Sequence, residues 1–303
     1  MISLIVCSRN TVLPLEFVEN IKRTIGVDYE IISIDNSQNK YSIFSAYNLG
    51  VKLSKSDYLC FIHDDVFFHT QNWGQKVINH LNIPQTGIIG LAGGDALTRV
   101  PSDWSALNPS VNIIHTDKHG IEPQEIVHFP KNYKKSSRSV VLLDGVFMCM
   151  NRTFFEKISF DERIGGFHGY DYDISIQSFM AGYTNYVIYD VIVEHFSKGN
   201  MDATYFRTLK KIFEKWEDHI PLFERNITKE EQSHLLPQLE TKRLNKLIKR
   251  LVRSGMPSRE TAEIISIYTK KINSKTAVFL LNFIRIRIFF IRITSTLRNK
   301  NNY

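Results

Sequence analysis

Short apolar runs alternate with helical patterns at the start of the chain. The pattern predicts buried strands over Ile2–Cys7, Tyr29–Ile34 and Asp57–Ile62, and helices over Leu15–Thr24 and Ile43–Leu53. The strands are apolar throughout, as expected where helices cover both faces of a parallel sheet. Strands that alternate with helices of this length indicate βαβ units. The first third of the chain is therefore predicted to begin a doubly wound α/β domain.

The middle of the chain is less regular. Gly93–Ser139 shows no sustained period and is expected to form a long irregular segment, which in a compact domain is usually functional or mobile. Regular structure is predicted to resume at Val140–Met150. A helix is predicted over Asp171–Ala181, a strand over Tyr186–Val193 and an amphipathic helix over Asp202–Asp218.

The charge divides the chain into two parts. Residues 1–225 carry a net charge of −4, whereas residues 226–303 carry +11 and show only helical patterns. We therefore expect an α/β domain over 1–225 and a basic helical tail over 226–303. A basic tail indicates an anionic partner.

The most apolar segment of the tail is Thr276–Leu297. Arg285, Arg287 and Arg292 interrupt it, and each would cost roughly 2.5–3.5 kcal/mol near the centre of a bilayer. A spanning helix is therefore not expected. Two alternatives stay open: a helix that lies in the interface of an anionic membrane, or a helix that packs on its neighbours or on a second copy of the chain. Nucleic acid is not an expected partner, because the tail lacks any recognisable nucleic-acid-binding signature.

Composition narrows the class of protein. The 303 residues are 43% apolar and 23% charged, which is ordinary for a globular protein and excludes wholesale disorder. The cysteines Cys7, Cys60 and Cys149 share no C-x-x-C spacing, so a disulfide framework or a cysteine zinc site is not expected. The first residues lack the features of a signal peptide. These features favour a cytoplasmic protein.

Polar residues that carry chemistry follow the predicted strands. Ligands bind at the carboxyl ends of strands in an open α/β sheet. The residues at these ends are Ser8, Arg9, Asn10, Asp35, Asn36, Ser37, His63, Asp64, Asp65 and His195. Adjacent carboxylates beside a core are costly unless a cation neutralises them. The arrangement therefore predicts a site for a divalent cation and a polyphosphate.

In this order, the motifs resemble the family-2-like glycosyltransferases of the GT-A fold over about residues 1–200. The segments that carry the resemblance are Ile2–Asn10, Ile31–Ser37, Asn48-Leu49-Gly50, Asp57–Val66, Gly169–Gln177 and His195 with Ser197 and Gly199. The resemblance implies a Rossmann-like nucleotide-sugar-binding sheet with flanking helices. It further implies that Asp65 and His195 bind Mn²⁺ or Mg²⁺. His63 departs from the family's pattern, because it stands where D-x-D has its first aspartate.

The resemblance also assigns the remaining candidates. Asp171 is implied as the base of an inverting transfer, although Asp171 and Asp173 are also residue types that cap a helix. The donor-binding candidates are Ser8, Arg9, Asn10, Asp35, Asn48, His63 and Asp64. The acceptor-binding candidates are Asp144, Gly145, Asp173 and Trp104, for which a plain turn or packing is the alternative. The histidines expected to lie at the surface or in packing are His69, His80, His115, His119, His128 and His168.

The function predicted by these features is metal-dependent, inverting transfer of a sugar, with UDP-sugars favoured as donors. The acceptor is expected to be a hydroxyl of a glycan or lipid-linked glycan in bacterial surface-polysaccharide synthesis. The basic tail would then hold the protein at the inner face of the cytoplasmic membrane. The alternative is a GT-A-like binding or scaffold subunit whose metal site has decayed at His63. Nucleotidyl transfer fits less well, because the first turn lacks a Gly-rich phosphate loop.

Overall fold

The computed structural model describes residues 1–116, 124–128, 136–197, 199 and 201–272. Within this part of the chain the contacts define two compact units. The first comprises residues 1–97, 103–200 and 222–226. The second comprises residues 98–102 and 201–221 together with the described residues from 227 onward. The prediction that a domain boundary follows residue 225 stays a prediction.

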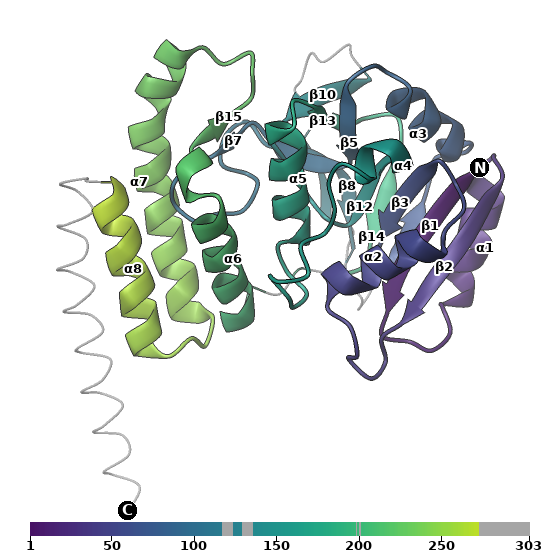
Figure 1. The fold of residues 1–303 in the computed structure, drawn as a ribbon, viewed down its shortest axis with the longest axis horizontal. Helices are drawn as coiled ribbons and strands as arrows, with labels where there is room; N and C mark the ends of the chain where they lie inside the picture. The colour runs from purple at the N-terminus through teal and green to yellow at the C-terminus, as the bar shows by residue number, and fades with distance from the viewer. Residues whose placement is uncertain (117–123, 129–135, 198, 200, 273–303) are drawn as a thin grey trace, which may run out of the picture. The chain divides into compact units, whose positions relative to one another are not determined.

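A seven-stranded sheet organises the first unit (Figure 1). Its order is β10 (Ser137–Val140), β13 (Thr184–Ile188), β5 (Thr86–Gly90), β12 (Phe147–Asn151), β3 (Tyr58–Ile62), β1 (Ile2–Ser8) and β2 (Tyr29–Asp35). The strands β1, β2 and β3 are parallel, as the apolar runs predict. The strand β12 is antiparallel to both β3 and β5, so the complete sheet is mixed.

A second sheet of six strands forms largely from the segment expected to be irregular. Its order is β11 (Leu142–Leu143), β6 (Ala92–Gly94), β8 (Ser110–His115), β14 (Val193–His195) and β4 (Val66–Phe68), and β9 (Gln124–His128) pairs with β8. The strands β7 (Ala96–Leu97) and β15 (Leu222–Phe223) form a separate pair. The expectation of a wholly irregular Gly93–Ser139 is therefore wrong. These strands are short, and polar side chains such as Asn112 are buried in them, so apolar periodicity does not reveal them.

Two predicted runs are divided between the sheets. The run Tyr186–Val193 does not form one strand, because β13 ends at Ile188 and β14 begins at Val193 in the other sheet. The crossing is fixed by Asn112, whose amide donates to the carbonyl oxygens of Ile188 and Val191 at 3.1 and 2.6 Å. The run Val140–Met150 is likewise split among β10, β11 and β12.

The described residues of the first unit form five helices. They are α1 (Leu15–Thr24), α2 (Ile43–Leu53), α3 (Trp73–Leu81), α4 (Arg152–Phe155) and α5 (Tyr170–Met180). Helix α2 packs on β1 and β2, α3 packs on β5, and α5 packs on β5 and β13 (Figure 1). The predicted helices at α1, α2 and α5 are confirmed to within one residue at each end, whereas α3 has no counterpart in the predictions.

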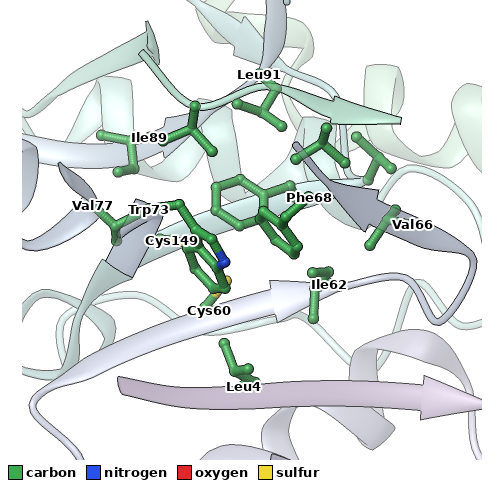
Figure 2. Packing of buried hydrophobic residues seen from close by; sticks show 14 of the residues in the cluster. Leu4, Cys60, Ile62, Val66, Phe68, Trp73, Val77, Ile89, Leu91 and Cys149 are labelled. Carbon is green, nitrogen blue, oxygen red and sulfur yellow. The ribbon is translucent and has the colours of Figure 1, made fainter. Parts of the chain in front are cut away.

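One apolar core contains buried side chains from both sheets and from helices α1 and α3. Figure 2 shows Leu4 and Ile62 of the larger sheet packed with Val66 and Phe68 of the smaller one. The rings of Phe68 and Trp73 stack, with centroids 4.1 Å apart and planes at 6°. Burial of each such side chain contributes about 1.5–3 kcal/mol. Because Ile62 ends β3 and Val66 begins β4, this packing holds the polar residues between them, His63, Asp64 and Asp65, in place.

The second unit is helical in its described part. It contains α6 (Ala203–Lys215), a short 3₁₀ turn η1 (Glu217–His219), α7 (Lys229–Arg253) and α8 (Ser258–Ile272). Helix α6 begins after Asp202, whose carboxylate accepts from two backbone N–H groups, and α7 begins at a capping box of Thr228 and Glu231. The helix predicted to reach Asp218 ends at Lys215. Predicted helices beyond residue 226 are confirmed over α7 and α8.

The apolar tail segment Thr276–Leu297 lies outside the described residues. Among the described helices, none has the length and apolar character needed to cross a bilayer.

Candidate active site

A short antiparallel ladder brings His195 beside Asp65. Strand β4 begins directly after Asp65, and its first residue, Val66, pairs with His195 at the end of β14. The backbone N–H of Phe196 donates to the carbonyl oxygen of Asp65 at 3.0 Å. Two residues that are far apart in the sequence therefore meet where β3 ends.

His63 completes a cluster of three potential metal ligands. The Nε2 atom of His195 lies 3.3 Å from Oδ1 of Asp65, and Nδ1 of His63 lies 3.9 Å from the same oxygen. One ligand atom from each residue lies within 4.8 Å of the other two. The imidazole rings of His63 and His195 have centroids 5.4 Å apart. This spacing suits coordination of one cation by all three side chains.

The protonation of the cluster also suits a metal ion. Burial disfavours the ionised form of Asp65, but the hydrogen bonds from His195 and Ser197 together with the charge interactions of His195 and His63 outweigh burial and hold the pKa of Asp65 well below its usual value. Desolvation lowers the pKa of His63, and the adjacent His195 lowers it further. The cluster thus offers a carboxylate and neutral imidazole, the ligand forms that divalent metals bind. In addition, Nδ1 of His195 is buried without a hydrogen-bond partner among the described residues.

The first strand and the end of β3 are joined by a hydrogen bond between predicted donor-binding residues. The hydroxyl of Ser8 donates to Oδ2 of Asp64 at 2.5 Å, and the backbone N–H of Asn10 donates to the same hydroxyl at 3.0 Å. Asp64 is thereby engaged with β1, whereas the alternate residues His63 and Asp65 belong to the metal-ligand cluster.

The other predicted donor-binding residues lie on separate elements of the first unit. Asp35 is exposed at the end of β2, in register with Ser8, and a hydrogen bond from the backbone N–H of Ser37 lowers its pKa. The guanidinium of Arg9 lies 5.6 Å from the centroid of the Phe167 ring. Asn48 lies on α2, and its amide donates at 2.8 Å both to the carbonyl of Phe160 and to the carboxylate of Glu162. In this structure Asn48 thus holds a loop, and its role toward a donor stays a prediction.

Asp171 lies in the first turn of α5 and is buried. Its carboxylate accepts from the backbone N–H groups of Gly145, at 3.1 Å, and Tyr172, at 3.0 Å. Burial, together with the nearby carboxylate of Asp144, raises the pKa of Asp171 to about 8. A carboxyl group with a pKa near neutrality is suited to general acid–base catalysis.

The structure brings three predicted acceptor-binding residues to Asp171. The indole N–H of Trp104 donates to Oδ2 of Asp144 at 2.9 Å, and Gly145 follows directly and contacts Asp171. The fourth, Asp173, is buried two residues further along α5. Its carboxylate accepts from the side-chain amide of Gln177 on the same helix at 2.8 Å. Trp104, Asp144 and Gly145 therefore form one cluster with Asp171.

Two residues at the site were not singled out from the sequence. The hydroxyl of Tyr170 lies 2.9 Å from Nε2 of His63 and donates to the carbonyl oxygen of Gly145 at 3.0 Å. His115, expected to be a surface or packing residue, pairs with His195 across β8 and β14, and their rings are 5.6 Å apart. The sequence signal for Tyr170 is its position directly before Asp171 in GYDYD, a motif that is interpreted above through its two aspartates.

The model of a family described as "Glycosyltransferase like family" matches residues 3–216. Among solved structures, GalNAc-T7 with UDP, GalNAc and Mn²⁺ is similar, with a TM-score of 0.51 and 11% sequence identity. The match covers 72% of this chain and 48% of that protein, so the chain spans about half of its length.

A second solved structure, A197 from STIV, matches 65% of this chain and 86% of its own, with 16% identity and a TM-score of 0.38. None of the curated proteins matches the chain. The family match and the GalNAc-T7 likeness together confirm the predicted GT-A fold and the resemblance to family-2-like glycosyltransferases.

Proposed function

The chain belongs to the glycosyltransferase-like family and is a glycosyltransferase, and from this premise we propose that it is a metal-dependent, inverting enzyme. It would transfer a sugar from a UDP-sugar to a hydroxyl group of a glycan or glycolipid. The observation that carries the proposal is the pairing of two features: the ligand cluster of His63, Asp65 and His195, and the buried Asp171, whose pKa is raised to about 8.

The donor side is supported by the residues at the ends of β1, β2 and β3. Asp65 and His195 would hold Mn²⁺ or Mg²⁺, and the ion would stabilise the charge that develops on the departing diphosphate. The similar GalNAc-T7 structure contains UDP and Mn²⁺, which favours this pairing for the donor. Asp35, exposed beside Ser8, is positioned to contact the nucleoside.

Asp171 would act on the acceptor. Its carboxylate takes the proton of the acceptor hydroxyl while that oxygen forms a bond to the anomeric carbon. The bond between the anomeric carbon and the diphosphate oxygen breaks, and its electron pair leaves with the nucleoside diphosphate. Attack from the face opposite the leaving group inverts the configuration at the sugar. The turn of Asp144 and Gly145, with Trp104 beside it, would bind the acceptor sugar.

Titration of UDP and GDP into the protein by calorimetry, with and without Mn²⁺, tests the donor proposal. We expect Mn²⁺-dependent binding of UDP that Asp65→Ala abolishes. Asp57→Ala is the matched control, because Asp57 is exposed and immediately precedes β3 at its other end. Failure of the unmodified protein to bind any nucleotide with Mn²⁺ would contradict the enzyme proposal and favour a binding or scaffold subunit.

The cellular role proposed is synthesis of a lipid-linked surface polysaccharide at the inner face of the cytoplasmic membrane. It is supported by the +11 charge of residues 226–303. The full chain should sediment with vesicles that contain anionic phosphatidylglycerol and not with neutral phosphatidylcholine vesicles. Reversing the charges of Arg285, Arg287 and Arg292 should weaken sedimentation and leave UDP binding intact. Equal sedimentation of both proteins would instead favour packing or self-association of this segment.

A further inference from the structure

We infer that His63 is a third ligand of the metal ion, through its Nδ1 atom, and that Tyr170 is the positioning residue that makes it one. This inference rests on the proposed metal-dependent function and concerns a position at which the chain departs from D-x-D. Its basis is a hydrogen-bond chain from His63 through the Tyr170 hydroxyl to Gly145.

The hydrogen bond that Tyr170 donates to Gly145 favours the tautomer of His63 that carries its proton on Nε2. The carbonyl oxygen of Gly145 can only accept, so the single hydroxyl proton of Tyr170 is directed to it at 3.0 Å. The oxygen of Tyr170, 2.9 Å from Nε2 of His63, must then accept from that nitrogen. A neutral imidazole that carries its proton on Nε2 has its lone pair on Nδ1. Nδ1 is the atom that lies 3.9 Å from Oδ1 of Asp65.

Packing holds the Tyr170 hydroxyl in place. The ring is buried at the start of α5, with the rings of Tyr47 and Phe160 at centroid distances of 5.4 and 6.2 Å. Gly145 permits the close approach, because a Cβ atom there would lie 2.3 Å from the hydroxyl oxygen. The hydrogen bond to His63 therefore has a rigid acceptor, which is how a second partner orients a metal-binding imidazole.

The same chain of contacts reaches Asp171. Gly145 accepts from Tyr170 through its carbonyl oxygen and donates through its N–H to Oδ2 of Asp171 at 3.1 Å. Gly145 thus contacts both Tyr170, which orients His63, and Asp171.

Replacement of a carboxylate by His63 also determines which ions bind well. The cluster presents two imidazole nitrogens and one carboxylate. Mg²⁺ prefers oxygen ligands, whereas Mn²⁺ and Co²⁺ bind imidazole more readily. We therefore expect the protein to select Mn²⁺ or Co²⁺ over Mg²⁺, and His63→Asp to reduce that selectivity.

The test uses Mn²⁺ alone with the full chain. Electron paramagnetic resonance titration measures the affinity for Mn²⁺, and hyperfine spectroscopy of protein labelled with ¹⁵N-histidine counts the nitrogens bound to it. We expect two nitrogens in the unmodified protein and one in His63→Asp. Tyr170→Phe keeps the buried ring but removes the hydroxyl, and it should weaken Mn²⁺ binding about 10–100-fold.

Tyr172→Phe is the matched control. It removes a hydroxyl on the same helix that accepts from the Trp104 backbone N–H at 3.1 Å, so Mn²⁺ affinity should not change. A single bound nitrogen in the unmodified protein, or equal affinities for Tyr170→Phe and Tyr172→Phe, would overturn the inference. If UDP still binds with Mn²⁺ in that event, the proposed function stands. An unmodified protein that binds neither Mn²⁺ nor UDP contradicts both.

Discussion

Asp65 and Asp171 are both carboxylates of the candidate active site, but their surroundings move their pKa values in opposite directions. Both lose hydration by burial, which disfavours ionisation. At Asp65 the hydrogen bonds from His195 and Ser197 and the charge interactions with both histidines together outweigh that loss and lower the pKa. At Asp171 the neighbouring group is the carboxylate of Asp144, and the pKa rises to about 8. The neighbouring groups therefore decide whether the effect of burial on the pKa is reversed, as at Asp65, or increased, as at Asp171.

The same substitution at both positions should give different losses, and this is the largest effect expected. Asp171→Asn should lower sugar transfer by about 10²–10⁴-fold while Mn²⁺-dependent UDP binding persists, because only the base is removed. Asp65→Asn should abolish that binding itself. Calorimetry and a transfer assay on the two variants measure the contrast. Loss of UDP binding in Asp171→Asn would show that the two carboxylates do not have separate roles.

The pH dependence sharpens the same contrast. Because folding raises the pKa of Asp171, the folded protein retains a proton that the unfolded chain has released between about pH 4 and pH 8. Its contribution to stability is therefore complete below about pH 4 and is lost as the pH rises toward 8, by about 1.4 kcal/mol per pH unit.

Denaturant unfolding of the metal-free protein at several pH values checks this sign, with Asp171→Asn as the control in which this contribution is absent. Transfer activity should rise with pH toward about 8, as the carboxylate form appears. Asp144→Asn should shift that rise to lower pH, since it removes the carboxylate that adds to the effect of burial. An unshifted profile would assign the raised pKa to burial alone.

Gly145→Ala should disturb both sides of the site together. The added methyl group would lie 2.3 Å from the Tyr170 hydroxyl, so we expect a loss of about 1–3 kcal/mol in the free energy of unfolding. Both Mn²⁺ affinity and transfer should fall. Gly199→Ala is the matched control, because no atom of the described residues lies within 4 Å of its Cβ position. Normal Mn²⁺ affinity in Gly145→Ala would separate the two sides.

Trp104→Phe should have the smallest effect and should be confined to the acceptor side. The substitution keeps a ring but removes the indole N–H that binds Asp144 at 2.9 Å. The free energy of unfolding should fall by about 1.5 kcal/mol, as for a hydrogen bond to a charged group. Mn²⁺-dependent UDP binding should match that of the unmodified protein. Weaker UDP binding would place Trp104 on the donor side instead.

The sequence predicts the βαβαβ start of the fold well, because each strand there is a continuous apolar run. It also places Asp65 and His195 in motifs of one family pattern, and the structure brings these two side chains to 3.3 Å of each other. It does not predict that Ser110–His115 is a strand, because Asn112 and Ser110 are polar and yet buried. The amide of Asn112 donates to carbonyl oxygens of Ile188 and Val191, and the hydroxyl of Ser110 accepts from Tyr189, so both bind distant segments that no local pattern reveals.

The contact of Tyr170 with His63 was hidden for a related reason. It depends on how α5 meets the Asp144-Gly145 turn, and that arrangement is set by packing between segments far apart in the chain. From the sequence alone, Tyr170 is expected to be an ordinary buried aromatic residue beside Asp171. Only the three-dimensional arrangement shows that its hydroxyl lies between an imidazole and a carbonyl.

The two histidines of the metal-ligand cluster are carried by different sheets. His63 follows β3 of the seven-stranded sheet, and His195 ends β14 of the six-stranded one. A cation held by both would link the two layers non-covalently. Ion concentration would then set the protein's resistance to heat and proteolysis as well as its turnover, by an amount that grows with the logarithm of that concentration.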